Sequence, residues 1–153
     1  MKVYLAFYKH KRKCNSLKNI VFRIFDEIIR FVTKGEFSHC EIAIPYDRNS
    51  DGQILYECYT SSNMDGGVRC KLMPLPQERW TLVPVKFNEE FVRTFFQLTI
   101  GAKYDFWGAL GVVLPIKESS RKFFCSEWCA ACLEMPQPSR YSPNSLYRKL
   151  TNR

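Results

Sequence analysis

The spacing of apolar residues changes twice along this chain, and this change limits the possible folds more than any other feature. Between residues 17 and 32, apolar residues recur every three or four positions, which predicts a long amphipathic helix. Between residues 37 and 87, short runs of β-branched and aromatic residues are separated by turn sequences such as Asp51-Gly52, which predicts an antiparallel meander. Helical spacing returns after residue 89. Strands in one block and helices in two predict an α+β domain.

The expected elements follow from these patterns. Strands are expected at residues 3–8, 37–44, 53–59, 67–72 and 80–87. Helices are expected at residues 17–32, 89–100, 104–113 and 125–135, and a last one is opened by Ser142-Pro143. Asn15 or Ser16 is the expected cap of the first helix, and Gly35 is expected to end it.

The size of the chain favours one globular domain that covers residues 1–153. The 153 residues are 46% hydrophobic, which is enough for one core, and no repeat or linker marks a second domain. No segment has the roughly 18 consecutive apolar residues that a membrane span needs, and charges interrupt the first residues too early for a secretory signal. We therefore expect a soluble, cytoplasmic protein.

The seven cysteines do not suggest a disulfide framework. Their number is odd, and they fall inside expected strands and helices rather than around short loops. Reduced thiols are therefore expected, most of them packed as small apolar side chains.

Positive charge is concentrated near the N-terminus. Residues 1–35 contain nine Lys and Arg and two acidic residues, so this segment carries +7 of the formal net charge of +8. The densest part, residues 9–13, could meet nucleic acid, an anionic membrane or an acidic cell-wall polymer. Because no aromatic-interleaved or groove-reading motif accompanies it, a solvated loop is the favoured interpretation.

Two histidines are present, so any mechanism that needs imidazole has two candidates. His10 lies in the basic segment, where neighbouring charges and solvent make a firmly held base improbable. His39 lies at the start of an expected strand, where it alternates with Ser38 and Cys40. We take His39 as the candidate base.

The best candidate nucleophile is Cys125. An extended aromatic segment, Phe123-Phe124, leads directly into a helix-forming sequence, so Cys125 is expected in the first helical turn. Unpaired amides and the positive end of the helix dipole stabilise a thiolate at that place. Cys129 and Cys132 follow on the same helical face and are expected to pack in the core.

The same three cysteines also have the spacing Cys-x-x-x-Cys-x-x-Cys of cluster-binding loops in radical enzymes. Such a loop normally follows an early strand of a much larger barrel, whereas these cysteines lie late in a short chain. A zinc site is equally disfavoured, because the spacing of paired knuckles is missing. We therefore expect neither a metal nor another cofactor.

A cysteine–histidine pair needs a third group to hold the imidazole, and two glutamates are available. Glu57 lies on the strand after His39, and Glu41 lies two residues after His39 on its own strand. Because residues on adjacent strands can lie directly opposite each other, Glu57 is preferred over Glu41.

This order of residues resembles the circularly permuted NlpC-type cysteine peptidases, the YiiX-like group related to lecithin-retinol acyltransferase. The resemblance covers most of the chain and rests on the segments Phe37 to Ile42, Glu57, Ser61 to Arg69, Gly101 to Phe106, and Phe124 to Glu127. It implies a papain-like core with a central antiparallel sheet packed against helices. It also implies that Cys125 forms an acyl-enzyme, and that Tyr104 and the amides of Cys125 and Ser126 bind the oxyanion.

Three functions are consistent with these residues. The leading one is a cysteine peptidase or amidase acting on a peptidoglycan-type peptide or another small amide; without an export signal, a phage-encoded enzyme would reach the wall after lysis. The second is an acyltransferase, thioesterase or esterase acting on lipid-like substrates through the same acyl-cysteine. The third is a non-enzymatic module that binds an anionic partner through the basic N-terminal region.

Overall fold

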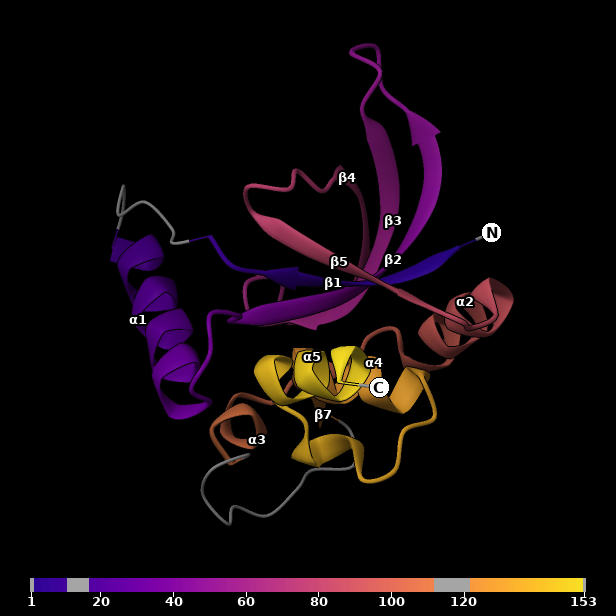
Figure 1. The fold of residues 1–153 in the computed structure, drawn as a ribbon. Coiled ribbons are helices and arrows are strands. Elements are labelled where there is room, and N and C mark those ends of the chain that lie inside the picture. The colour runs from indigo at the N-terminus through magenta and orange to yellow at the C-terminus, as the bar shows by residue number, and fades with distance from the viewer. Residues whose placement is uncertain (1, 11–16, 112–121, 153) are drawn as a thin grey trace.

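A computed structural model describes residues 2–10, 17–111 and 122–152 and has mixed α and β structure (Figure 1). The strands form one curled seven-stranded sheet with the order β5-β1-β2-β3-β4-β6-β7. The strands are β1 (Val3–Tyr8), β2 (His39–Arg48), β3 (Ile54–Ser62), β4 (Gly67–Pro74), β5 (Trp80–Val85), β6 (Lys103–Tyr104) and β7 (Lys122–Phe123). The helices are α1 (Leu17–Val32), α2 (Glu89–Thr99), α3 (Phe106–Gly111), α4 (Cys125–Cys132) and α5 (Pro143–Thr151), with a short 3-10 turn at Pro138–Arg140. The predicted α+β class is confirmed.

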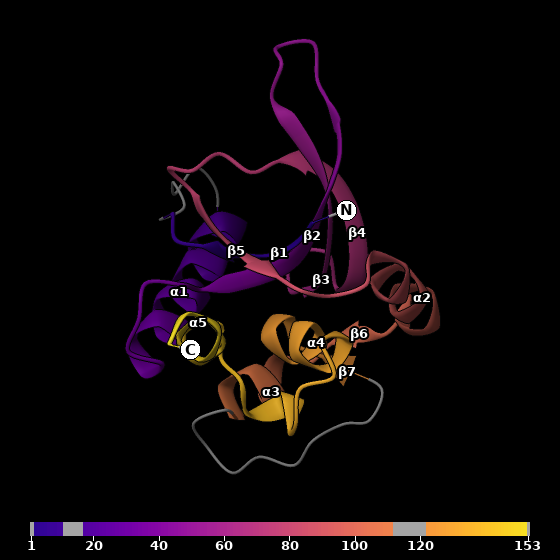
Figure 2. The same cartoon turned by 45° about the vertical axis from the view of Figure 1, so that its right-hand side comes forward.

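The sheet is antiparallel except at one edge. Strands β2, β3 and β4 pair in chain order, as the predicted meander requires, and β1 pairs with β2 on one side and β5 on the other. Only the two-residue strands β6 and β7 run parallel to each other. Figures 1 and 2 show that the far ends of β2 and β3 extend away from the rest of the molecule.

The main core lies between the sheet and helices α4 and α5, which cover one of its faces (Figure 2). Trp128 of α4 is fully buried there against sheet residues that include Phe7 and Ile42. Its indole Nε1–H donates to Thr99 Oγ1 over 2.9 Å, so the ring is buried without an unsatisfied polar atom. A second cluster, which includes Ala43 and Trp80, lies on the other face of the sheet.

The segment that leads into β2 is fixed by Asn144 of α5. The Asn144 Oδ1 accepts from the Phe37 N–H over 3.0 Å, and Nδ2 donates to the Phe37 carbonyl over 2.8 Å. Gly35 is required beside it, since a Cβ at Gly35 would lie 2.2 Å from Asn144 Oδ1. Because His39 comes two residues after Phe37, this clamp also sets where the histidine lies.

Two predicted helices have different bounds in the structure. The expected helix at residues 104–113 is wrong at its start, because Tyr104 pairs with Phe123 in the sheet and the helix begins at Phe106. The Asp105 carboxylate there accepts from the Gly108 N–H over 2.9 Å. The helix expected at residues 125–135 ends at Cys132, since Glu134 has a left-handed φ of 53° and closes the helix.

The six cysteines within the described part of the chain are free thiols, which confirms the expectation for them. Cys14 and the predicted caps Asn15 and Ser16 lie outside the described residues. Over residues 2–10, 17–111 and 122–152, we find no helix with the length and apolar character needed to cross a bilayer.

Candidate active site

Cys125 is the first residue of α4, as the sequence predicts. The preceding Phe124 has extended backbone angles, φ −94° and ψ 169°, and its N–H donates to Glu127 Oε2 over 3.3 Å. Because Cys125 and Ser126 open the helix, their own N–H groups have no partner within it. The thiol is therefore held where the helix dipole and backbone amides favour a negative charge.

Several hydrogen bonds fix the approach to α4. Ser61 of β3 donates to the Phe123 carbonyl over 2.6 Å, and the Asp105 N–H donates to the same oxygen over 3.0 Å. The Ser126 hydroxyl donates to the Tyr141 carbonyl over 2.6 Å. The side chain of Ser126 thus anchors the helix, and any role of this residue in oxyanion binding falls to its backbone amide.

His39 is the first residue of β2 and lies beside Cys125. Its Nε2 lies 3.0 Å from Glu41 Oε1, and Cys125 is close enough to raise the pKa of His39, so Nδ1 is the ring nitrogen left for the thiol. The imidazole also has an edge contact with the Trp80 ring, with centroids 6.4 Å apart. This arrangement is compatible with the predicted pairing of Cys125 with His39.

The prediction that Glu57 orients the histidine is wrong. Glu57 lies opposite Ile44 in the β2–β3 register, five residues along the strand from His39. Its carboxylate instead accepts from Arg93 Nη2 over 2.8 Å and from the Tyr59 hydroxyl over 3.0 Å. Glu41, the other candidate, contacts the imidazole instead, because residues two apart on a strand lie on the same face of the sheet.

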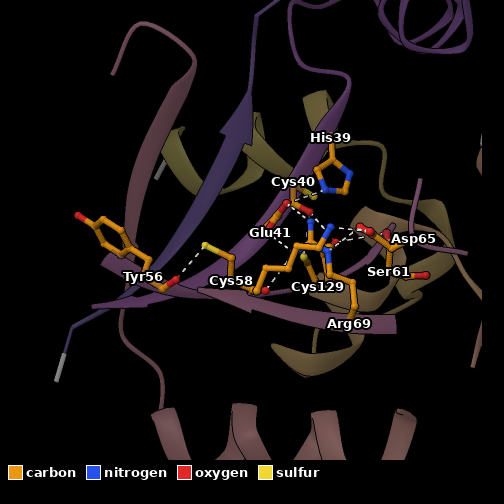
Figure 3. Close-up of polar contacts among 11 residues, drawn as sticks. His39, Cys40, Glu41, Tyr56, Cys58, Ser61, Asp65, Arg69 and Cys129 are labelled. Carbon is orange, nitrogen blue, oxygen red and sulfur yellow. Dashed lines mark hydrogen bonds and ion pairs between the residues drawn. The ribbon is translucent and has the colours of Figure 1, made fainter. Parts of the chain in front are cut away.

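Arg69 of β4 binds Glu41 on its other side (Figure 3). The sequence did not identify this arginine as a residue of the site. Arg69 Nη2 donates to Glu41 Oε1 over 2.7 Å and Nη1 donates to Oε2 over 2.9 Å, while Nε donates to Asp65 over 3.0 Å. A bidentate pair of this kind fixes the carboxylate plane. Arg69 was hard to find from the sequence, because only the pairing of β3 with β4 brings it to this face.

The pKa shifts describe an ion pair between thiolate and imidazolium. Burial alone would lower the pKa of His39, but Cys125 and Glu41 outweigh it and raise that pKa to about 10. Hydrogen bonding from Cys40 and the proximity of His39 outweigh burial and hold the pKa of Cys125 well below its usual range. Burial would raise the pKa of Glu41, but His39 and Arg69 lower it to about 2. These directions favour a negative charge on Cys125 and on Glu41 and a positive charge on His39.

Two neighbouring hollows give access to these groups. The larger one, about 200 Å³, is lined by His39, Glu41 and Arg69 on its polar side and by apolar side chains that include Trp80 and Phe25. The smaller one, about 10 Å³, is lined by Cys125 itself. Tyr104 and Ser38 line both hollows, so the two hollows adjoin at these residues.

Tyr104 reaches this position through the edge of the sheet. Lys103 pairs with Gly67 and Lys122, and Tyr104 pairs with Phe123, two residues before the cysteine. Burial raises the pKa of the Tyr104 hydroxyl, and the charge of Cys125 raises it further. The hydroxyl therefore stays protonated and can donate a hydrogen bond. Its placement is compatible with the expected role in oxyanion binding.

The two other cysteines of α4, Cys129 and Cys132, are fully buried in the main core. Within the part of the chain that the structure describes, no three His, Cys, Asp or Glu side chains are grouped so that they could hold a metal ion.

Replacing Arg69 with methionine is expected to reduce the free energy of unfolding by about 3 kcal/mol, because the Glu41 carboxylate is 1% exposed and would lose its bidentate partner. Urea unfolding followed by circular dichroism measures this loss. The matched control is Arg93→Met, which removes a cation from the more exposed Glu57 and should cost less than about 1 kcal/mol. Equal losses in the two variants would contradict a special role for the buried pair.

Comparison with known proteins gives no family for this chain. No protein-family model matches it, and neither does any curated protein sequence.

Proposed function

We propose that this chain is a papain-like cysteine hydrolase of the permuted NlpC type, with Cys125 as nucleophile, His39 as base and Glu41 as the group that orients the imidazole. The observation that supports the proposal is that Cys125 begins a helix beside His39, whose Nε2 lies 3.0 Å from Glu41 Oε1. Nucleophile, base and orienting acid are the three parts of a thiol hydrolase.

The first half of the reaction forms an acyl-enzyme. The Cys125 thiolate attacks the substrate carbonyl carbon, and the oxygen becomes an oxyanion. We expect the N–H groups of Cys125 and Ser126 and the hydroxyl of Tyr104 to donate hydrogen bonds to this oxyanion. The His39 imidazolium then gives its proton to the leaving nitrogen or oxygen, the bond to that atom breaks, and a thioester on Cys125 remains.

The second half releases the acyl group. Neutral His39 takes a proton from a water molecule in the cavity, and the resulting hydroxide attacks the thioester carbonyl. The carbon–sulfur bond breaks and the thiolate returns beside the imidazolium. Glu41 keeps Nε2 protonated throughout, so Nδ1 remains the nitrogen that exchanges protons.

The preferred substrate class is a small amide, such as the peptide of a peptidoglycan fragment. Arg69 and Lys71 line the larger cavity. Arg69 is already bound to Glu41 and Asp65, so the half-exposed Lys71, although it also pairs with Asp65, is the cation that would meet a substrate carboxylate, which such peptides carry.

A second substrate class, acyl esters or thioesters, is supported by the rest of the cavity lining. Phe22, Phe25, Met64, Met73 and Trp80 give it a broad apolar side. Such a surface suits an acyl chain better than a charged peptide. Hydrolysis and acyl transfer would both proceed through the same thioester.

The proposal is tested by trapping the acyl-enzyme with p-nitrophenyl acetate. Intact-protein and peptide mass spectrometry after rapid acid quenching should show one acetyl group, located on the peptide that contains Cys125. Muropeptides and long-chain acyl esters then distinguish the two substrate classes. If no adduct forms and neither substrate class is turned over, the proposal that this protein is an enzyme is contradicted. The remaining alternative is then a non-enzymatic module that binds an anionic partner, as the basic N-terminal region suggests.

A further inference from the structure

One face of helix α1 consists of exposed apolar side chains, which the fold does not use. We call it the apolar stripe: Leu17, Ile20, Val21, Ile24, Ile28 and Phe31. At 100° per residue these six positions fall within an arc of roughly 100° along the whole helix. Leu17 is 83% exposed and Phe31 is 85% exposed. A contiguous apolar surface of this kind indicates an interaction site.

The opposite face of α1 is already occupied. Phe25 and Ile29 are buried with Phe124, and Phe25 stacks on Phe106 with ring centroids 4.8 Å apart. Arg30 is also buried and donates to the Glu36 carbonyl over 2.8 Å. The helix is therefore fixed through one side. It lies at the edge of the molecule (Figure 1), and the side chains of the apolar stripe are exposed.

The charges around the apolar stripe are mainly positive. The first 25 residues contain seven Lys and Arg and no Asp or Glu, and three of these basic residues, at positions 11–13, come shortly before Leu17. The two acidic residues of α1 do not offset them at the surface, since Asp26 is buried and Glu27 is paired with Arg30 over 2.7 Å.

The positive charge and the exposed apolar side chains together indicate which partner binds the apolar stripe. A second copy of the chain would bring a second set of positive charges to the same place, and the repulsion would oppose pairing. A nucleic acid would match the charge and leave the apolar side chains in water. An anionic lipid bilayer offers both a negative headgroup layer and an apolar boundary beneath it.

We propose that α1 is an interfacial helix that docks this protein on an anionic membrane surface through the apolar stripe. The helix lies in the plane of the headgroups, with Leu17, Ile24 and Phe31 in the acyl boundary, and the positive charge of the chain around it favours the anionic phosphates. Its inner face carries Phe22 and Phe25, which also line the cavity that contains His39. Docking thus brings the cavity close to the bilayer. The inference stands on the helix surface alone and does not depend on the catalytic proposal.

The test is co-sedimentation of the full chain with vesicles of phosphatidylcholine alone and of phosphatidylcholine mixed with phosphatidylglycerol. Wild-type protein should bind the mixed vesicles, and raised salt should weaken that binding. The double variant Val21→Gln, Phe31→Gln should bind at least about tenfold more weakly, because two side chains no longer enter the acyl boundary. The matched control, Leu98→Gln with Ile100→Gln, removes two other exposed apolar side chains at the end of α2 and should bind like the wild type.

Three outcomes would overturn the proposal: no binding to either vesicle, equal binding to both, or equal loss in both double variants. Sedimentation velocity without lipid tests whether the apolar stripe instead binds a second copy of the chain. A wild-type dimer that the α1 variant alone abolishes would assign the apolar stripe to a second copy. Alkylation of Cys125 should be the same in all three proteins, so a failure of membrane docking is distinguishable from a failure of the catalytic site.

Discussion

Replacing Cys125 with alanine is expected to reduce the hydrolysis of p-nitrophenyl acetate, or of any substrate found by profiling, by at least about 10⁴-fold. The thiolate forms the covalent bond, and no neighbouring group replaces it: the Cys40 thiol is buried in the core, where its pKa is raised well above the usual range, first of all by burial. The rate is measured by release of p-nitrophenol, with the uncatalysed reaction subtracted.

The matched control for this variant is Cys129→Ala, one turn further along the same helix. Cys129 is fully buried and its thiol lies 3.8 Å from the Cys40 carbonyl, so its loss affects packing without removing the nucleophile. Activity of Cys129→Ala should stay within a few-fold of the wild type. If Cys125→Ala keeps its activity, or if both variants lose it equally, Cys125 is not the nucleophile.

Replacing Glu41 with glutamine should lower kcat/KM on the order of a thousandfold. The amide keeps the size of the side chain but removes the negative charge that stabilises protonated His39 and selects its tautomer. The pKa of His39 should fall from about 10 in this variant, and the pKa of Cys125 should rise toward its ordinary value. A pH–rate profile records both changes.

Glu57→Gln is the control that separates the two glutamates. Glu57 is bound to Arg93 and Tyr59, away from the histidine, so this variant should keep kcat/KM and the pH profile within a few-fold. The opposite result, in which Glu57→Gln is inactive and Glu41→Gln is active, would contradict the site described above.

Those elements that are specified by local sequence could be predicted well. The apolar period of residues 17–32 predicted α1 (Leu17–Val32), and Phe123-Phe124 before a helix-forming sequence predicted Cys125 at the start of α4. Asn88 and Ser142 cap α2 and α5 through their own side chains. Capping and periodicity depend on neighbours in the chain, which is why the sequence carries them.

Features set by strand pairing could not be predicted in the same way. The choice between Glu57 and Glu41 required the β2–β3 register, and the register places Glu57 beside Ile44 rather than beside His39. Tyr104 was expected in a helix because the two-residue strand that contains it is specified by Lys103 pairing with Gly67, far back in the chain. Arg69 reaches Glu41 only after β3 and β4 have paired.

The exposed face of α1 is a different case. Its periodicity predicted an amphipathic helix, and such a pattern is normally read as one apolar face against the core. The structure has apolar residues on both sides of the helix, and only the side with Phe25 and Ile29 is covered. Tertiary packing decides which apolar face of α1 is buried. The spacing of apolar residues in the sequence does not reveal it.

The most direct test of the thiolate–imidazolium pair is the rate at which iodoacetamide alkylates each cysteine between pH 5 and 9, read by peptide mass spectrometry. Because the pKa of Cys125 is held well below its usual range, its rate should stay nearly constant across this interval, and His39→Ala should make it fall with pH. Cys70, whose pKa is raised, is the internal reference and should react about tenfold more slowly for each unit of lower pH. A Cys125 rate that falls in parallel with that of Cys70 in the wild type would contradict the account.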